Sequence, residues 1–250
     1  MDKLTNTHIT DANGHRICTS TWSNGPTVQL VTPSQLLTSA KFGKLTDALH
    51  TNAANFALST ERMLATFNKV GVRENAPKNI SAVSRSFTEL QKAGIDGKSG
   101  NDQFRTTWAS KRNVDPALAG EIRTFLRTSK PGDAAIAVLE HPDFAAAALA
   151  AYSLTGLPAS LRPRVEEVAI RAALADAYAP QTNAKATAAQ PLLSGPDRPA
   201  LDRLVAQAIV QHEAACAEVE MVEITLRGAV DFIAGVADVP REQAFSLLAA

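Results

Sequence analysis

The strongest candidate for metal or acid–base chemistry is a short stretch around His212. In His212-Glu213-Ala214-Ala215-Cys216 an imidazole and a thiol are four residues apart, the spacing that places two ligands on one face of a helix. The sequence indicates no third ligand, and both residues lie on an apolar stripe, so a packed histidine and a buried thiol are the better interpretation. The carboxylates at Glu213, Glu218, Glu220 and Glu223 are expected on a solvated helix face rather than in acid–base catalysis.

Other signatures of catalysis are missing from the sequence. It has no glycine-rich phosphate loop, no nucleophile elbow and no cysteine pair at metal spacing. The two cysteines, Cys18 and Cys216, are expected to be reduced thiols, with a disulfide as the alternative. The sequence therefore predicts a protein that is not an enzyme and has no catalytic residues, metal site, cofactor or small-molecule substrate.

Basic side chains are concentrated in the middle of the chain. Between residues 61 and 130, thirteen Lys and Arg stand against seven Asp and Glu. Arg123, Arg127 and Lys130 share one helical face, and Lys111-Arg112 follows the aromatics Phe104 and Trp108. Such a surface would neutralise phosphates while the aromatic rings stack on bases. An ordinary solvated face is the alternative.

Residues 79–95, NISAVSRSFTELQKAGI, begin with several serines and an arginine and end in Leu-x-x-x-Gly-Ile. This segment resembles the recognition helix of winged helix-turn-helix regulators, which enters the major groove and is followed by a wing hairpin. The resemblance covers seventeen residues and implies base or phosphate contacts from Ser81, Ser84 and Arg85, with Lys98 on a wing. Together with the basic surface, the predicted nucleic-acid-binding residues are Ser81, Ser84, Arg85, Lys98, Arg105, Lys111, Arg112, Arg123, Arg127 and Lys130.

Charge is unevenly distributed along the chain, although the formal net charge is zero. Residues 1–130 carry 17 Lys and Arg against 10 Asp and Glu, whereas residues 131–250 carry 8 against 15. Composition changes at the same place, from Ser, Thr and Asn to Ala. This asymmetry predicts different partners for the two halves, or attraction between them within one molecule or between neighbours.

The periodicity of apolar residues predicts a mainly α protein, a multi-helix bundle with a small N-terminal β-meander. We expect three regions. Residues 1–31 form a β-meander arm, and residues 32–130 form a basic helical domain. Residues 131–250 form an acidic, Ala-rich helical domain with a Pro-rich linker at 180–199.

Local signals divide these regions further. Asn13-Gly14 is the strongest hairpin turn signal, and residues 71–79 are expected to be a loop. Gly94 is expected to end a helix, and the polar residues 96–101 are expected to form a turn. The longest amphipathic stripe runs through 201–226.

The sequence also bears on location. No apolar stretch approaches the about 20 residues that span a bilayer, and the first residues lack the apolar run of a secretory signal. We therefore expect a soluble, cytoplasmic protein without a membrane partner, while export as an effector and packaging in a particle stay open.

Three classes of function follow. The first is a non-enzymatic protein that binds DNA or RNA, assembles into homo-oligomers, or does both, like a regulator, a nucleoid protein or a nucleocapsid-like protein. Its basic half would contact phosphates and its acidic C-terminal helices would contact neighbouring subunits. The alternatives are a helical protein–protein interaction module or exported bacterial effector without nucleic acid, and an enzyme without a recognisable motif.

Overall fold

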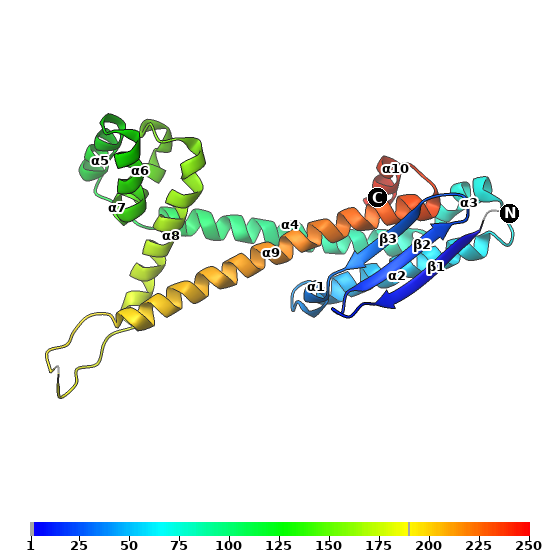
Figure 1. Cartoon of the computed structure of the whole chain (residues 1–250), viewed down its shortest axis with the longest axis horizontal. Helices are drawn as coiled ribbons and strands as arrows, with labels where there is room; N and C mark the ends of the chain where they lie inside the picture. Colours follow the sequence, from blue (N-terminus) through cyan, green and yellow to red (C-terminus); the bar gives the residue numbers. More distant parts are fainter. Residues whose placement is uncertain (1–2, 190) are drawn as a thin grey trace. The chain divides into compact units, whose positions relative to one another are not determined.

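The computed structural model describes residues 3–189 and 191–250. Helices make up most of these residues, and a three-stranded antiparallel sheet lies near the N-terminus (Figure 1). This confirms the predicted fold class, mainly α with a small N-terminal β-meander. The chain forms two compact units. We call residues 1–98 and 215–250 the sheet unit, and residues 99–214 the helical unit.

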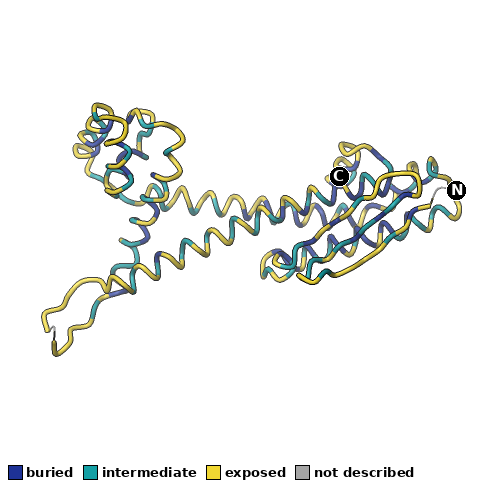
Figure 2. The backbone as a smooth tube through the Cα atoms, viewed as in Figure 1, coloured by how far each residue is buried: buried dark blue, intermediate teal, exposed yellow. Residues whose placement is uncertain are grey.

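The sheet consists of β1 (Leu4–Thr10), β2 (Arg16–Trp22) and β3 (Thr27–Thr32) in that order. A turn lies between β1 and β2 where the Asn-Gly signal predicts it, and Gly14 takes a positive φ of 78° there. The connection runs from residue 11 to residue 15, so it is longer than the two-residue turn that this dipeptide favours. Leu4 pairs with Trp22 and Cys18 with Leu30. Because side chains alternate along a strand, these residues share one face, and all four are buried. The buried residues of this unit gather where the sheet packs against the helices (Figure 2).

The helices of the sheet unit begin with α1 (Ser34–Thr38), α2 (Gly43–Met63) and α3 (Lys69–Asn75), followed by a 3-10 turn, Ala76–Asn79. The N-terminal part of α4 (Ser81–Ser110), the C-terminal part of α9 (Arg198–Ala237) and α10 (Arg241–Leu248) complete it. Their buried side chains form one core with the inner face of the sheet, which includes Leu49, Phe56, Phe87, Leu90, Phe232, Ile233 and Leu248.

Three local predictions in this unit are wrong. Residues 71–79 are helical rather than a loop, since Asn68 caps α3 by accepting a hydrogen bond from the amide of Gly71 (2.9 Å). Gly94 does not end a helix, and residues 96–101 continue α4 instead of forming a turn. Gly94 and Gly97 are buried against α9, so tertiary packing outweighs the local preference of glycine for a helix end.

The helical unit contains α5 (Pro116–Thr128), α6 (Pro131–Glu140), α7 (Pro142–Ala150) and α8 (Arg162–Tyr178), together with the C-terminal part of α4 and the N-terminal part of α9. Short 3-10 turns occur at Tyr152–Leu154, Ala159–Leu161 and Ala179–Gln181. Prolines open α5, α6 and α7, where their missing amide hydrogen costs nothing. Alanines fill much of the core between these helices, which brings the helix backbones close together.

This division differs from the predicted regions. The sheet does not form a separate arm, because its inner face is buried by helices from both ends of the chain. The composition change at Lys130 falls between α5 and α6, inside the helical unit. In the Pro-rich segment 180–199 a bridge joins Asn183 to Pro196, and the last two residues, Arg198 and Pro199, already belong to α9. Residue 190 lies outside the described residues.

None of the helices in the described part of the chain is both long enough and apolar enough to cross a membrane.

Gly235 marks the closest approach of α9 to the sheet. A Cβ atom here would lie 2.8 Å from Cγ2 of Val28 and 3.1 Å from its Cβ, so no rotation of Val28 relieves the overlap. The indole Nε1 of Trp22 also donates to the carbonyl of Gly235 (2.9 Å). At Gly228, on the same helix, the nearest atom to such a Cβ is 3.8 Å away.

We therefore expect Gly235→Ala to lower the free energy of unfolding by about 1–3 kcal/mol through overpacking. The matched control, Gly228→Ala, should raise it by about 0.5–1 kcal/mol, because alanine favours the helix. Urea denaturation of both variants measures the difference. Equal stability of the two variants would contradict a close contact between α9 and β3 at Gly235.

His50 supplies a second test. Its side chain is buried, and Nδ1 is hydrogen-bonded to Oγ1 of Thr32 (2.8 Å). Burial lowers the pKa of His50 to about 4, and the charges of Arg16 and His8 act in the same direction. Because the unfolded chain binds this proton near pH 6.5, folding loses stability as the pH falls from about 6.5 to 4.

We expect this loss to be about 2–3 kcal/mol and to disappear from the pH profile of His50→Gln. Urea denaturation at pH 4.5 to 7.5 measures the free energy of unfolding of the parent and of the variant. The difference between the two at each pH removes the contributions of the other titrating groups. Parallel profiles would show that His50 has the same pKa in both states.

Candidate functional site

The ten predicted nucleic-acid-binding residues are divided between the two units. Ser81, Ser84, Arg85 and Lys98 lie on α4 in the sheet unit, whereas Arg105, Lys111, Arg112, Arg123, Arg127 and Lys130 belong to the helical unit. Lys98, predicted to lie on a wing, is part of the continuous helix α4. The predicted residues therefore do not form a single cluster within either unit.

Several of these arginines are already engaged by carboxylates. In the helical unit Arg105 pairs with Glu166 (2.6 Å), and Arg112 pairs with Asp143 (2.8 Å) and with Asp176. The hydrogen bond with Asp143 raises the pKa of Arg112 above its ordinary value. All three carboxylates come from the acidic part of the sequence, so basic and acidic stretches neutralise each other inside the unit.

Two further predicted arginines also have partners. Arg123 donates to the carbonyl of Ala147 (3.3 Å), and Arg85 forms an exposed pair with Glu89 one turn along α4 (3.1 Å). Exposed pairs of this kind contribute little to stability. They still reduce the positive field that a phosphate would meet.

Net charge shows the same compensation for each unit as a whole. The sheet unit contains 13 Lys and Arg and 13 Asp and Glu, and the helical unit contains 12 of each. The asymmetry between residues 1–130 and 131–250 therefore vanishes in three dimensions. Of the interpretations that the asymmetry allowed, attraction within one molecule accounts for these contacts.

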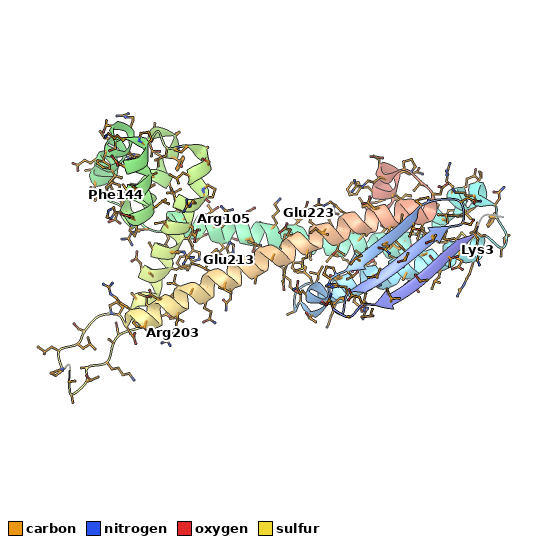
Figure 3. The ribbon with its side chains drawn as sticks, viewed as in Figure 1. Lys3, Arg105, Phe144, Arg203, Glu213 and Glu223 are labelled. Atoms are coloured by element: carbon orange, nitrogen blue, oxygen red, sulfur yellow. The ribbon has the colours of Figure 1, made fainter. Side chains whose placement is uncertain are left out.

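His212 and Cys216 lie on α9, His212 in the helical unit and Cys216 in the sheet unit. The imidazole of His212 stacks on the ring of Phe104, with the ring centres 4.3 Å apart. Burial lowers the pKa of His212, and the charge of Arg105 (Figure 3) lowers it further against the opposing effect of Glu213. Among the described residues, no cluster of three His, Cys, Asp or Glu side chains is placed to hold a metal ion.

Cys18 is a free thiol. Cys18 is buried in the sheet unit, and burial raises the pKa of its thiol to about 12. A thiol in this state is unreactive at neutral pH. Cys216 is half-buried rather than buried as predicted.

A cavity of about 570 Å³ lies within the helical unit, among α4, α5, α7 and α8. Arg105, Arg112 and Arg162 line it, which suggests an anion site at first sight. However, Arg105 and Arg162 both pair with Glu166, and Arg112 is held by its two aspartates. The arginines are therefore compensated, and they join α4 and the segment after it to α7 and α8.

The sheet unit has a larger concave surface, a groove of about 720 Å³ between α4, α9 and α10. We call it the α4/α9/α10 groove. Its floor is apolar and buried, formed by Phe87, Gly94, Val222 and Val230. Ile95 and Phe245 line it as well, yet they are 62% and 46% exposed.

Two glycines bring α4 and α9 close together beside this groove, and one of them, Gly94, lines it. A Cβ at Gly94 would lie 3.0 Å from Cγ1 of Val222, and one at Gly97 would lie 2.8 Å from Cγ2 of Val219. The pairing 94 with 222 and 97 with 219 shows that α4 and α9 run antiparallel here. Without side chains on α4, the two backbones approach closely, which leaves a smooth trough beside them.

The charged groups at the groove differ in how they are paired. Glu223 (Figure 3) forms an ion pair with Arg227 (3.1 Å), and Arg241 forms one with Asp231 (2.7 Å). Lys98 and Glu242 also line the groove, and no salt bridge within residues 3–189 and 191–250 involves either of them.

Sequence reasoning missed this groove. Val219, Val222 and Leu226 were correctly placed on an apolar stripe, but α4 was expected to stop at Gly94. The available signal was that Phe87, Gln91, Gly94, Ile95 and Lys98 follow one helical stripe when the helix is continued.

Comparisons with known proteins supply no relative: no family model matches the chain, and neither a curated protein nor a solved structure matches it.

Arg127 and Lys130 test the nucleic-acid hypothesis most directly. Both are exposed, and neither forms a salt bridge among the described residues. If they contact phosphates, Arg127→Glu with Lys130→Glu should lower the slope of log K against log[salt] by about two. Fluorescence anisotropy of labelled single- and double-stranded oligonucleotides measures the slope.

Arg171→Gln is the matched control, because Arg171 is an exposed arginine already paired with Glu167 (2.9 Å). It should leave the slope nearly unchanged. Absence of binding at low salt, or the same slope in all variants, would contradict phosphate contacts from the C-terminal end of α5.

Proposed function

We propose that this protein is a non-enzymatic binding protein that holds a protein partner in the α4/α9/α10 groove. The observation that carries the proposal is the exposure of two large apolar side chains, Ile95 and Phe245, beside a buried apolar floor. A folded chain gains free energy by covering such side chains, at about 25 cal/mol per Å² of apolar area. Exposed apolar patches rimmed by charge are typical of protein interaction sites.

The groove suits a polypeptide in length and chemistry. From Phe87 to Lys98 the stripe on α4 extends for about 16 Å, or three helical turns. An amphipathic helix that presents apolar residues at positions i, i+3 or i+4, and i+7 would fit against such a stripe. The aromatic ring of Phe245, set edge-on to Phe87 with ring centres 6.3 Å apart, resembles the anchors that dominate binding energy at interfaces.

The supporting elements are rigid. The two helices that form the floor are packed through Gly94 and Gly97, and α10 is fixed by Ala244 and Leu248 in the core. A preformed surface loses little entropy on binding, which favours affinity. Binding and self-assembly were both predicted from the sequence, and the groove serves either.

The observations favour this proposal over nucleic-acid binding. Each unit has equal numbers of acidic and basic residues, and the best-placed arginines of the helical unit are bound to carboxylates. We also propose a cytoplasmic location, which the free thiol of Cys18 supports.

Site-specific photo-crosslinking in cells that naturally make the protein tests the proposal. A photoreactive residue placed at Ile95 or Phe245 should crosslink to one discrete protein. The same residue at Lys92 on α4 or Ile224 on α9, both exposed and outside the groove, should give no such product. Absence of a crosslinked protein at Ile95 and Phe245, or equal crosslinking from all four positions, would refute a partner in the groove.

A further inference from the structure

The two unpaired charges of the groove lie at its opposite ends. Phe245 of α10 contacts Phe87 of α4, and Glu242 is one helical turn before Phe245. Lys98 is eleven residues beyond Phe87, about 16 Å further along α4. The lining therefore has a carboxylate at the α10 end and an ammonium group at the other end. Between them lie apolar residues together with Gln91 and the Glu223–Arg227 ion pair.

This arrangement is complementary to itself. Two identical surfaces related by a twofold axis perpendicular to the groove run antiparallel, so each end of one contacts the opposite end of the other. In such a pair the ammonium of Lys98 faces the carboxylate of the partner's Glu242, and the same contact occurs twice. The apolar centres face each other at the axis.

From this charge complementarity we propose that the occupant of the α4/α9/α10 groove is the same groove of a second copy of this chain. Ile95 and Phe245 of each copy cover the floor of the other, and two Lys98–Glu242 pairs set the antiparallel orientation. The inference rests on the proposed function, because it names the partner that the groove binds.

Charge favours the antiparallel orientation of the two copies over the parallel one. A parallel arrangement would place Lys98 against Lys98 and Glu242 against Glu242, which like-charge repulsion disfavours. The other lining charges are already paired within the chain, so they neither oppose nor demand a particular partner. The preference for the antiparallel dimer therefore depends on Lys98 and Glu242, and the signs of these two charges can be swapped by mutation.

Charge-swap variants of the full chain provide the test. Lys98→Glu alone and Glu242→Lys alone should each raise the dimer dissociation constant about tenfold, because each turns two attractive contacts into repulsive ones. The double variant Lys98→Glu/Glu242→Lys should return to within about threefold of the parent protein, since the pairs are re-formed with reversed sign. Sedimentation equilibrium measures all four proteins.

Mixing the two single variants gives an independent readout. Their 1:1 mixture should form a heterodimer in which both contacts are attractive, tighter than either homodimer. Rescue in the mixture and in the double variant also separates an interface effect from damage to α10, where Glu242 lies in the first turn. Damage of that kind would persist in both.

Substitution of the apolar centre completes the test. Ile95→Glu should yield a monomer with unchanged helical circular dichroism, whereas the control Ile224→Glu, an exposed isoleucine outside the groove, should stay dimeric. A parent protein that is still monomeric at about 100 μM would overturn the proposal, because its dimer dissociation constant would then lie above the micromolar range of specific dimers. So would a dimer that is insensitive to Ile95→Glu, or single-charge effects that neither the double variant nor the mixture reverses.

The same experiments distinguish this inference from the proposed function. A monomeric parent whose Ile95 crosslinks to a different protein would leave the groove as a binding site and exclude the second copy. A monomeric parent without groove crosslinks would overturn both.

Discussion

The sheet unit depends on the close approach of two antiparallel helices, α4 and α9, at Gly94 and Gly97. Valines of α9 occupy the space that side chains on α4 would need. The contact keeps α4 helical through a sequence that is otherwise typical of a turn, and it brings Phe87 and Val222 into one core. On the side left uncovered by the sheet, the same contact produces the floor of the groove.

Glycine has a related role at the other face of α9. There Gly235 admits Val28 of β3 and accepts a hydrogen bond from Trp22. Helix α9 thus contacts the sheet through its own backbone at Gly235, and it contacts the backbone of α4 through Val219 and Val222. A helix fixed in this way is a rigid support, which explains how large apolar groups beside it can stay exposed without collapsing onto the core.

Electrostatics in this protein are mostly internal. The acidic residues of the second half of the sequence neutralise the basic residues of the first half within the same compact unit, as Arg112 does with Asp143 and Asp176. Among the charged residues that line the groove, Lys98 and Glu242 form no salt bridge with another described residue. Apolar contact supplies the free energy of association in our proposal, and the two charges supply orientation.

The sequence by itself determined the features that depend on neighbouring residues. Asn13-Gly14 determined the position of the first hairpin, Pro116 determined where α5 begins, and the stripe through 201–226 determined the larger part of α9, which continues to Ala237. The tertiary structure alone decided the continuity of α4 through Gly97, the pairing of Arg105 with Glu166, and the α4/α9/α10 groove. Each of these joins residues dozens of positions apart in the chain. Local preferences operate over one or two turns, whereas such contacts arise only when the core closes and its packing energy exceeds those preferences.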